Sequence, residues 1–496
     1  MERAAGILLP VFSLPSRYGI GSLGKEAYAF IDFLSQAGQR WWQVLPVGPA
    51  GAGNSPYSSV STFAGDPLLI DLEELVREGL LDRKELQEAE LPAASQIDYP
   101  AVAERKKKLL RRAFQSGGQR LHGQIEAFTN SNVWVKNYAL YISCKEYYHG
   151  ESWLQWQDDA LRRRTPEAVA EWSEKLSGEI AYHTFVQLLF FRQWERLRQY
   201  AHGAGIQILG DLPIYVSLDS ADVWGERREF LLRADGYPEK IAGVPPDYFS
   251  QEGQLWGNPL YDWEAMRTDG FGWWIRRVAG ASRLYDAIRI DHFRGLESYW
   301  AVPFGAETAK AGAWEQGPGM DLLRVLTDWF PQVSYVAEDL GILTPEVGEL
   351  RRKAGLPGMK VLEFAFSGAD NAYLPHNYPD AHCICYTGTH DNDTAMGWWS
   401  HAGEQEREFA RRYLGMESDR EIVSAMLRCG QGSVAELFVA QMQDYLQLGS
   451  EARMNVPGVA NGNWRWRLQA GQLTPELAVQ IRQLTETYGR CAKTHQ

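Results

Sequence analysis

Short apolar runs recur along the chain, and each has the length and the β-branched or aromatic content of a buried strand. They lie at Ile7–Phe12, Trp41–Val47, Ile206–Leu209, Ala287–Ile290, Val333–Ala337, Met359–Phe366, Cys383–Thr387 and Leu437–Ala440. Between several runs, as over Lys25–Gly38, Met320–Phe330 and Thr344–Ala354, the apolar positions take the 3.6-residue spacing of amphipathic helices. Parallel strands that alternate with helices in this way predict an α/β fold, the (β/α)8 or TIM barrel.

Two long segments interrupt this alternation. Residues 71–203 show helical spacing, with predicted helices at Leu72–Leu81, Ala101–Gln115, Val133–His149, Pro166–Lys175 and Ile180–Ala201. Residues 219–275 are rich in Pro, Gly and Trp, and a long irregular stretch of this kind is usually a functional loop. We therefore expect a catalytic barrel over residues 1–496 with an inserted helical subdomain at 71–203 and a loop-rich segment at 219–275 over the active site. We expect no C-terminal β-domain, because little chain follows Trp466.

Composition narrows the class of protein. The formal net charge of -13 argues against a nucleic-acid partner. No apolar run approaches the roughly 18 residues of a membrane helix, so no membrane partner is expected, and no obligatory protein partner is evident. The five scattered cysteines favour reduced thiols and a cytoplasmic location. The 19 Trp, 23 Tyr and 19 Phe suit a cleft that stacks flat, partly apolar ligands such as sugar rings.

Two cofactor-like patterns are not interpreted as sites. Gly19–Gly24 matches the dinucleotide pattern G-x-G-x-x-G, but the acidic residue that this pattern requires about 20 positions later is missing. His382, Cys383 and Cys385 with His390 could suggest zinc, but the two cysteines share one strand. We therefore predict no metal and no cofactor.

Charged residues follow the predicted strands, at the end of the barrel where this fold carries its chemistry. They are Asp211, Arg289, Asp291, Glu338, His390 and Asp391. A purely structural role would need several buried ion pairs at one rim, which is costly. Arg289 and Asp291 lie two apart and share a face of their strand. The arginine would keep Asp291 ionised, as a nucleophile requires.

The other two carboxyl groups suit complementary roles. Glu338 follows an apolar strand, where desolvation would raise its pKa toward that of a general acid. Asp391 could neutralise the positive charge that develops on a sugar ring. A pair of carboxyl groups about 5–5.5 Å apart suits double displacement at a sugar carbon with retention of configuration.

The sequences around these residues resemble the four sequence regions of the α-amylase clan. They are Gly-Asp-Leu-Pro-Ile-Tyr-Val at Asp211, Arg-Ile-Asp-His-Phe-Arg-Gly at Asp291, Ala-Glu-Asp-Leu-Gly at Glu338 and Gly-Thr-His-Asp-Asn-Asp-Thr at Asp391. Further stretches resemble the amylomaltase family, also called disproportionating enzyme or 4-α-glucanotransferase. These are Tyr18–Gly24, Ser55–Ser58, Pro245–Phe249, Arg453–Gly458 and Asn463–Arg467. The resemblance covers nearly the whole chain.

This resemblance implies roles for individual residues. Asp291 would be the nucleophile, Glu338 the acid/base and Asp391 the transition-state stabiliser. The substrate-binding residues would be Asp211, Arg289 and His390 at the cleavage point, Tyr57 and Trp256 stacking on neighbouring rings, and Asn463.

The implied activity is that of a retaining 4-α-glucanotransferase, with α-1,4-glucans such as maltooligosaccharides, starch or glycogen fragments as substrates. Two alternatives are an α-1,4-glucan hydrolase of the α-amylase type and a catalytically silent glucan-binding protein. The intact set of three carboxyl groups argues against the silent protein, and the family-like flanks and the long segment near Trp256 argue against the hydrolase.

Overall fold

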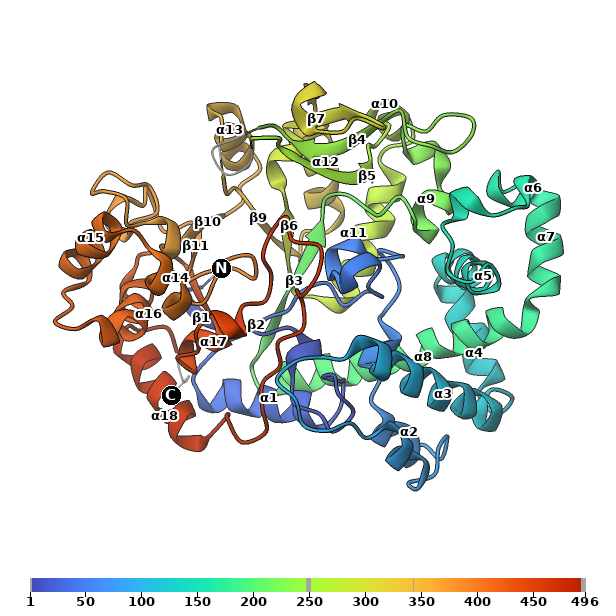
Figure 1. Ribbon diagram of the computed structural model, residues 1–496, viewed down its shortest axis with the longest axis horizontal. Helices are drawn as coiled ribbons and strands as arrows, with labels where there is room; N and C mark the ends of the chain where they lie inside the picture. The colour runs from blue at the N-terminus through green and yellow to red at the C-terminus, as the bar shows by residue number, and fades with distance from the viewer. Residues whose placement is uncertain (1, 247–250, 342, 492–496) are drawn as a thin grey trace.

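The fold is built around one parallel sheet of eight strands in the computed structural model, which describes residues 2–246, 251–341 and 343–491 (Figure 1). The strands are β1 (Ala4–Leu8), β2 (Trp41–Gln43), β3 (Gln207–Pro213), β6 (Ala287–Asp291), β9 (Ser334–Ala337), β10 (Gly358–Val361), β11 (Cys383–Tyr386) and β12 (Leu437–Gln441). Their order in the sheet is β10-β11-β12-β1-β2-β3-β6-β9, and every pairing is parallel. The backbone N–H of Ala337 donates to the carbonyl of Pro357 at 2.9 Å and links the two outermost strands. The predicted TIM barrel is confirmed.

Each predicted strand is present, but some boundaries differ. The run Ile7–Phe12 was expected to be one strand, whereas β1 ends at Leu8 and Val11–Ser13 form a 3₁₀ turn. Pro10 explains this difference, because it has no N–H to donate to a sheet ladder. Likewise β10 ends at Val361, where the prediction continued to Phe366.

Beyond residue 71, helices are the regular elements of the described chain between β2 and β3, and loops connect them. They are α2 (Leu72–Arg77), α3 (Tyr99–Gly117), α4 (His122–Ser131), α5 (Trp134–Tyr147), α6 (Asp159–Arg162), α7 (Pro166–Lys175) and α8 (Ser177–Gly203). Several begin at the expected capping residues, for example Thr165, whose side chain accepts a bond from the N–H of Ala168. Figure 1 shows α4 to α7 at one side of the molecule, away from the barrel strands. The division of this segment into a separate subdomain stays a prediction.

A second sheet was not predicted. Its strands are β4 (Lys240–Val244), β5 (Gln254–Pro259), β7 (Ser298–Pro303) and β8 (Ala313–Gln316), in the antiparallel order β5-β4-β7-β8. The expectation of an inserted, loop-rich segment at 219–275 over the active site stays a prediction, but the sequence did not show that strands occur in it. The segment holds β4, β5, α9 (Ala221–Gly225), α10 (Trp263–Thr268) and the start of α11 (Gly272–Leu284). The stretch Pro245–Phe249 lies largely outside the described residues.

The remaining α-helices lie before, between and after the other barrel strands in the sequence. They are α1 (Lys25–Gln36), α12 (Gly319–Trp329), α13 (Pro345–Lys353), α14 (Ala395–His401), α15 (Glu404–Leu414), α16 (Ile422–Gly432), α17 (Met442–Tyr445) and α18 (Pro475–Thr487). The barrel interior holds its own cluster of buried apolar side chains, among them Leu8, Leu209, Met359 and Val439. Asp211 and Arg289 lie two residues beyond Leu209 and Ala287, which belong to this apolar cluster. No helix in the described ranges is long and apolar enough to cross a membrane.

Candidate active site

Strand alternation brings the predicted charged residues to one end of the barrel interior. Leu209 of β3 and Ala287 of β6 belong to the apolar cluster inside the barrel. Because side chains two residues apart on a strand share a face, Asp211, Arg289 and Asp291 point to the same interior. They lie at the C-terminal ends of β3 and β6, which run side by side with Asp211 opposite Arg289.

Arg289 is the centre of the charge network. Its Nη1 atom donates to both carboxylate oxygens of Asp211, at 2.8 and 2.6 Å, and to Oδ1 of Asp291 at 2.9 Å. The side chain of Arg289 is only 3% exposed and that of Asp211 is 0% exposed, whereas that of Asp291 is 27% exposed. Burial opposes the charge of Arg289, but Asp211 and Asp291 raise its pKa well above the ordinary value. The cation therefore holds Asp291 beside it while leaving this carboxylate open to a ligand.

Tyr57 links this network to His390. Tyr57 lies in the 3₁₀ turn Pro56–Ser58, and its hydroxyl donates to Oδ2 of Asp211 at 2.8 Å. Nδ1 of His390 lies 3.3 Å from the same Tyr57 oxygen. Nε2 of His390 lies 3.4 Å from Oδ1 of Asp391. The imidazole of His390 therefore lies between Tyr57 and Asp391.

Glu338 has the surroundings of a general acid. It directly follows β9, and the backbone N–H groups of His292 and Leu340 donate to its two oxygens at 2.8 and 3.1 Å. Burial raises the pKa of Glu338 to about 7; Arg289 opposes this rise and Asp291 adds to it. A carboxyl group with this pKa can both give and take a proton near neutral pH.

Asp391 is held by residues from a distant loop. Nδ2 of Asn455 donates to Oδ1 of Asp391 at 2.6 Å, and Nη2 of Arg453 donates to the backbone carbonyl of Asp391 at 2.8 Å. The side chain of Asp391 is 45% exposed, the most open of the charged groups at this end of the barrel. Its orientation is thus fixed from one side while the other remains free for a ligand.

Aromatic side chains flank the carboxyl groups. Tyr57 and His390 stack with their ring centroids 4.8 Å apart, and Trp464 lies within 6 Å of both rings. Trp256 of β5 is 36% exposed and meets His292 edge to face at 4.7 Å. The sequence motifs quoted for the family contain Trp464, Arg453 and Asn455, but no role was assigned to them.

Asn463 is engaged elsewhere. Its side-chain oxygen accepts a bond from the N–H of Val456, and its Nδ2 donates to the carbonyls of Val456 and Val459. These bonds close the loop that follows Asn455, so the described contacts make Asn463 a support of that loop. Its predicted contact with substrate stays a prediction.

A family assignment can now be made. A family model described as 4-alpha-glucanotransferase matches residues 9–474. The chain belongs to this family. The 4-alpha-glucanotransferase of Aquifex aeolicus is 47% identical over 98% of this chain and 99% of its own length, and that of Thermus thermophilus is 45% identical over 99% of both. The solved structure of the amylomaltase from Streptococcus agalactiae in complex with acarbose matches with a TM-score of 0.96 at 36% identity, over 99% of this chain and 100% of that chain.

These findings confirm three predictions made from the sequence. The amylomaltase or 4-α-glucanotransferase family, the enzyme class and the fold are all as expected. The roles of individual residues are not tested by them and are taken up below.

Beside Trp256 the surface of this family member opens into a cavity of about 820 Å³. The cavity is bounded by the chain around Asn54 and Ser58, by helices α3, α5 and α8 and by the loop at Asp219. Ligand pockets typically have volumes of about 300–1,000 Å³. The volume of this cavity falls within that range.

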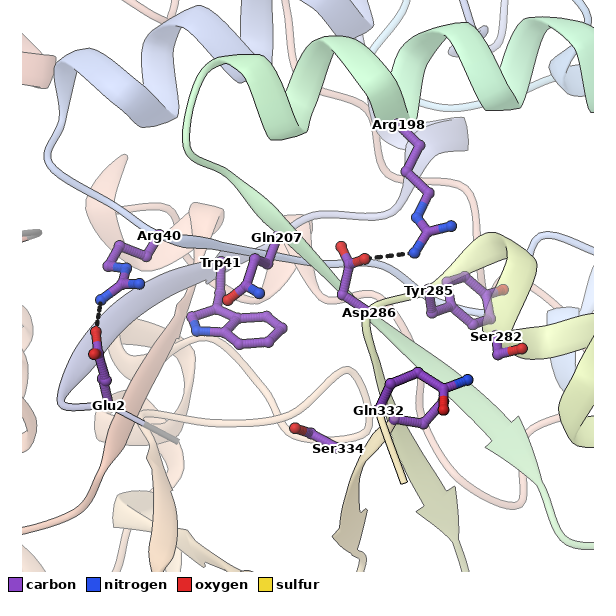
Figure 2. Close-up of a pocket in the computed structure, with 11 residues that line it drawn as sticks. Glu2, Arg40, Trp41, Arg198, Gln207, Ser282, Tyr285, Asp286, Gln332 and Ser334 are labelled. Carbon is purple, nitrogen blue, oxygen red and sulfur yellow. Dashed lines mark hydrogen bonds and ion pairs between the residues drawn. The ribbon is translucent and has the colours of Figure 1, made fainter. Parts of the chain in front are cut away.

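A smaller pocket lies at the opposite end of the barrel. Its volume is about 390 Å³, and Trp41, Gln207 and Ser334 line it from the N-terminal ends of β2, β3 and β9 (Figure 2). Its charges are already paired, since Arg198 bonds Asp286 at 2.6 Å. In this fold the N-terminal end serves stability, and the pocket contains none of the predicted site residues.

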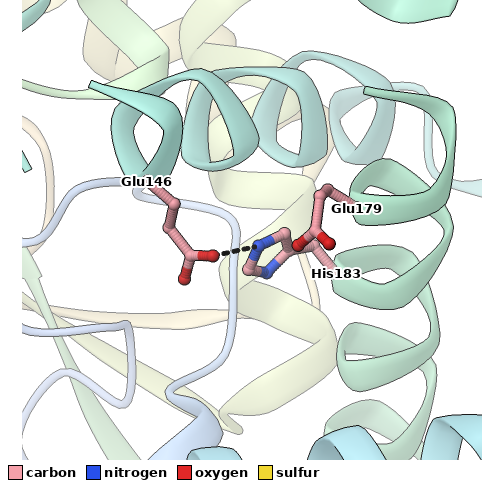
Figure 3. A group of neighbouring side chains, drawn as sticks. All are labelled: Glu146, Glu179 and His183. Atoms are coloured by element: carbon pink, nitrogen blue, oxygen red, sulfur yellow. Dashed lines mark ion pairs between the residues drawn. The ribbon is translucent and has the colours of Figure 1, made fainter. Parts of the chain in front are cut away.

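One group of possible metal ligands occurs within the described residues. It consists of Glu146 of α5 with Glu179 and His183 of α8, whose ligand atoms lie within 4.8 Å of one another (Figure 3). However, Arg111 pairs with both glutamates and Lys107 pairs with Glu146 at 2.9 Å. Two anions and two cations already balance, so these residues form an ion network between helices and need no metal.

Proposed function

We propose that this protein is a retaining 4-α-glucanotransferase that cleaves α-1,4-glucans and transfers the glucanosyl unit through a covalent intermediate on Asp291. The proposal rests on two carboxyl groups of the site, Asp291 and Glu338, whose surroundings differ. Asp291 is ion-paired with Arg289 at 2.9 Å, while burial raises the pKa of Glu338 to about 7. Pairs of carboxyl groups whose environments separate their protonation states are the usual acid and nucleophile of glycoside chemistry.

In the first step Asp291 attacks the anomeric carbon of the bound glucan. Glu338 gives its proton to the glycosidic oxygen, and the reducing-end fragment leaves as an alcohol. Asp391, oriented by Asn455, stabilises the positive charge that develops on the ring carbon and oxygen. Asp211 and His390 offer hydrogen bonds to the hydroxyls of the same sugar.

In the second step the 4-hydroxyl of another glucan or of glucose attacks the glycosyl–Asp291 bond. Glu338, now ionised, takes the proton of that hydroxyl, so the enzyme returns to its starting state. Retention follows because two inversions occur at one carbon. Water at about 55 M competes for the same intermediate, so a bound acceptor must win by proximity and orientation. Trp256, partly exposed beside the turn of His292, offers a ring against which an acceptor sugar can stack.

The competing proposal is hydrolysis, and the product pattern from maltotriose separates the two. Transfer gives glucose together with a ladder of shorter and longer maltooligosaccharides, whereas hydrolysis gives shorter products alone. Asp291→Asn should abolish both product patterns while the circular dichroism spectrum stays that of the wild type. A wild type that yields only maltose and glucose would contradict the transferase, and an active Asp291→Asn would contradict the nucleophile.

A further inference from the structure

The turn that carries His390 and Asp391 rests on a group of buried acids. The turn spans Gly388–Asp393, between the end of β11 and the start of α14. Asp444 of α17 is 1% exposed and bonds both flanks of the turn. Its Oδ2 accepts from the Thr387 hydroxyl at 2.5 Å and its Oδ1 accepts from the N–H of Ala395 at 2.8 Å.

Glu363 braces the same turn from β10. It lies in the 3₁₀ turn that follows that strand, and its N–H donates to the carbonyl of Thr387 at 3.2 Å. Its carboxyl group presses on Gly388, where an added Cβ would come within 2.5 Å of Oε1. Nε2 of Gln441 lies against the same point and donates to the carbonyl of Asp393 at 2.8 Å. A side chain at position 388 would require these two side chains to move.

The surroundings of Glu363 disfavour a negative charge. Glu363 is 6% exposed, and its Oε1 has no hydrogen-bond partner among the described residues. Its charged neighbours are the carboxyl groups of Asp444 and Asp393 and the cation of Arg453, which lies 3.9 Å from Asp393. Arg453 and a backbone hydrogen bond at Asp393 favour the charge of Glu363, but burial and the two carboxyl groups outweigh them. His401 of α14 lies 4.0 Å from Asp393 as well.

These surroundings shift the titration of the buried acids. Burial, Asp444 and Asp393 raise the pKa of Glu363 well above its ordinary value, and burial raises that of Asp444 to about 6. The side-chain oxygen of Gln441 is a second buried acceptor without a partner in the described part of the chain. A protonated Glu363 can donate a hydrogen bond, which the ionised group cannot.

We propose that Glu363 is a positioning residue that works as an uncharged carboxylic acid and holds the Gly388–Asp393 turn so that His390 and Asp391 face the sugar. Ionised Glu363 would add a negative charge beside Asp444 and Asp393 and push the turn away from β10. The effect on catalysis rests on the proposed function, because Asp391 is the group that the turn presents.

The test compares two variants of Glu363 with a matched surface control. Glu363→Gln has the shape of the uncharged acid, and we expect its kcat on maltotriose at pH 6 to stay within roughly threefold of the wild type. Glu363→Ala removes the brace, and we expect kcat to fall roughly tenfold or more with KM little changed, since small misplacements of catalytic groups can cost up to about 10²-fold. Glu408→Gln, at an exposed position of α15, should behave as the wild type.

Thermal unfolding between pH 5 and 9 tests the protonation itself. The folded state binds the Glu363 proton more tightly than the unfolded state, whose pKa is near 4.5, so the wild type loses stability from this group as pH rises. The Tm of Glu363→Gln should therefore rise relative to that of the wild type from pH 5 to pH 9, whereas Glu408→Gln should show no such trend. This readout does not require any enzymatic activity, so it stands even if the transferase assignment fails.

Three results would overturn the inference. One is a Glu363→Gln variant that loses as much kcat as Glu363→Ala at every pH, which would mean that the anion is required. Another is a Tm difference for Glu363→Gln that stays constant or shrinks with rising pH. The third is a folded Glu363→Ala variant with wild-type kcat, which would leave Glu363 no positioning role.

Discussion

Replacing Glu338 by Gln separates the acid step from the rest of the reaction. With its pKa near 7, half of the Glu338 carboxyl groups carry a proton at pH 7. A glutamate at the ordinary value of 4.5 would be protonated in roughly one molecule in 300 at that pH, so the site gains about 150-fold in available acid. Glu338→Gln removes this proton, and general acid–base help is worth roughly 10²–10⁴-fold. We expect a loss of this size in kcat on maltotriose.

An activated donor is the decisive assay. The fluoride ion of α-maltosyl fluoride leaves without being protonated. Glu338→Gln should therefore still form the glycosyl–Asp291 species from this donor. The species would be visible as a mass increase of one maltosyl unit in the denatured protein. Wild-type kcat/KM should decline above pH 7 with maltotriose but much less with the fluoride. Equal losses of Glu338→Gln on both donors would refute the assignment of the proton donor.

The same shift in pKa makes a stability prediction. The folded-state pKa of Glu338 lies above the unfolded value, so its contribution to stability is present below pH 4.5 and is lost as pH rises through 7. The Tm of Glu338→Gln should therefore exceed that of the wild type above pH 7 and approach it near pH 4.5.

Three further changes test other parts of the site. Asn455→Ala should lower kcat roughly tenfold with little change in KM, because Asp391 would lose its 2.6 Å bond and its orientation. Asn455→Asp should lower kcat further, because it places two negative charges side by side. Wild-type kcat in both variants would contradict the role of Asn455. Trp256→Gly should raise the ratio of hydrolysis to transfer from maltotriose, and an unchanged ratio would show that this ring does not select the acceptor. Dialysis against a chelator should leave kcat and Tm unchanged, whereas a loss restored by calcium would contradict a metal-free reaction.

The barrel and the charged residues of its mouth could be predicted because both depend on local patterns. Apolar runs of four to eight residues mark buried strands, and the polar residue just past each run marks the end that carries chemistry. Arg289 and Asp291 are two apart on β6, so their shared face follows from the strand period alone. Their ion pair at 2.9 Å is what that spacing predicts.

The second sheet could not be predicted in this way. β4 is five residues long, includes Gly243, and pairs with β7, which lies beyond the barrel strand β6. One of its two partners is distant in sequence, and neither its length nor its composition marks it as a strand. Pro245 and Pro246 directly after it favour a loop interpretation of the whole segment.

The contacts that hold the proposed site residues were missed for a related reason. Asn455 and Asp391 are separated by 64 positions, and no pattern in either segment shows that they touch. Asn463 shows the same limit, because the family-like motif does not reveal that its amide bonds the backbone of its own loop. A motif identifies residues that belong together, but the partner of each side chain comes only from the fold.

The protonation of the two carboxyl groups also depends on the fold, and the sequence alone does not determine it. Asp291 and Glu338 are both acidic residues at strand ends, and the sequence suggested their different roles through one neighbouring arginine and one apolar strand. In the structure Arg289 lowers the pKa of Glu338, so a neighbouring arginine alone does not mark a carboxyl group as the nucleophile. Burial outweighs that effect at Glu338, whereas Asp291 keeps 27% of its side chain exposed beside the cation. The different proposed roles of these two carboxyl groups thus depend on how deeply each lies in the barrel mouth. Any substitution that opens the site around Glu338 to water should lower the pKa of Glu338 and weaken it as a general acid.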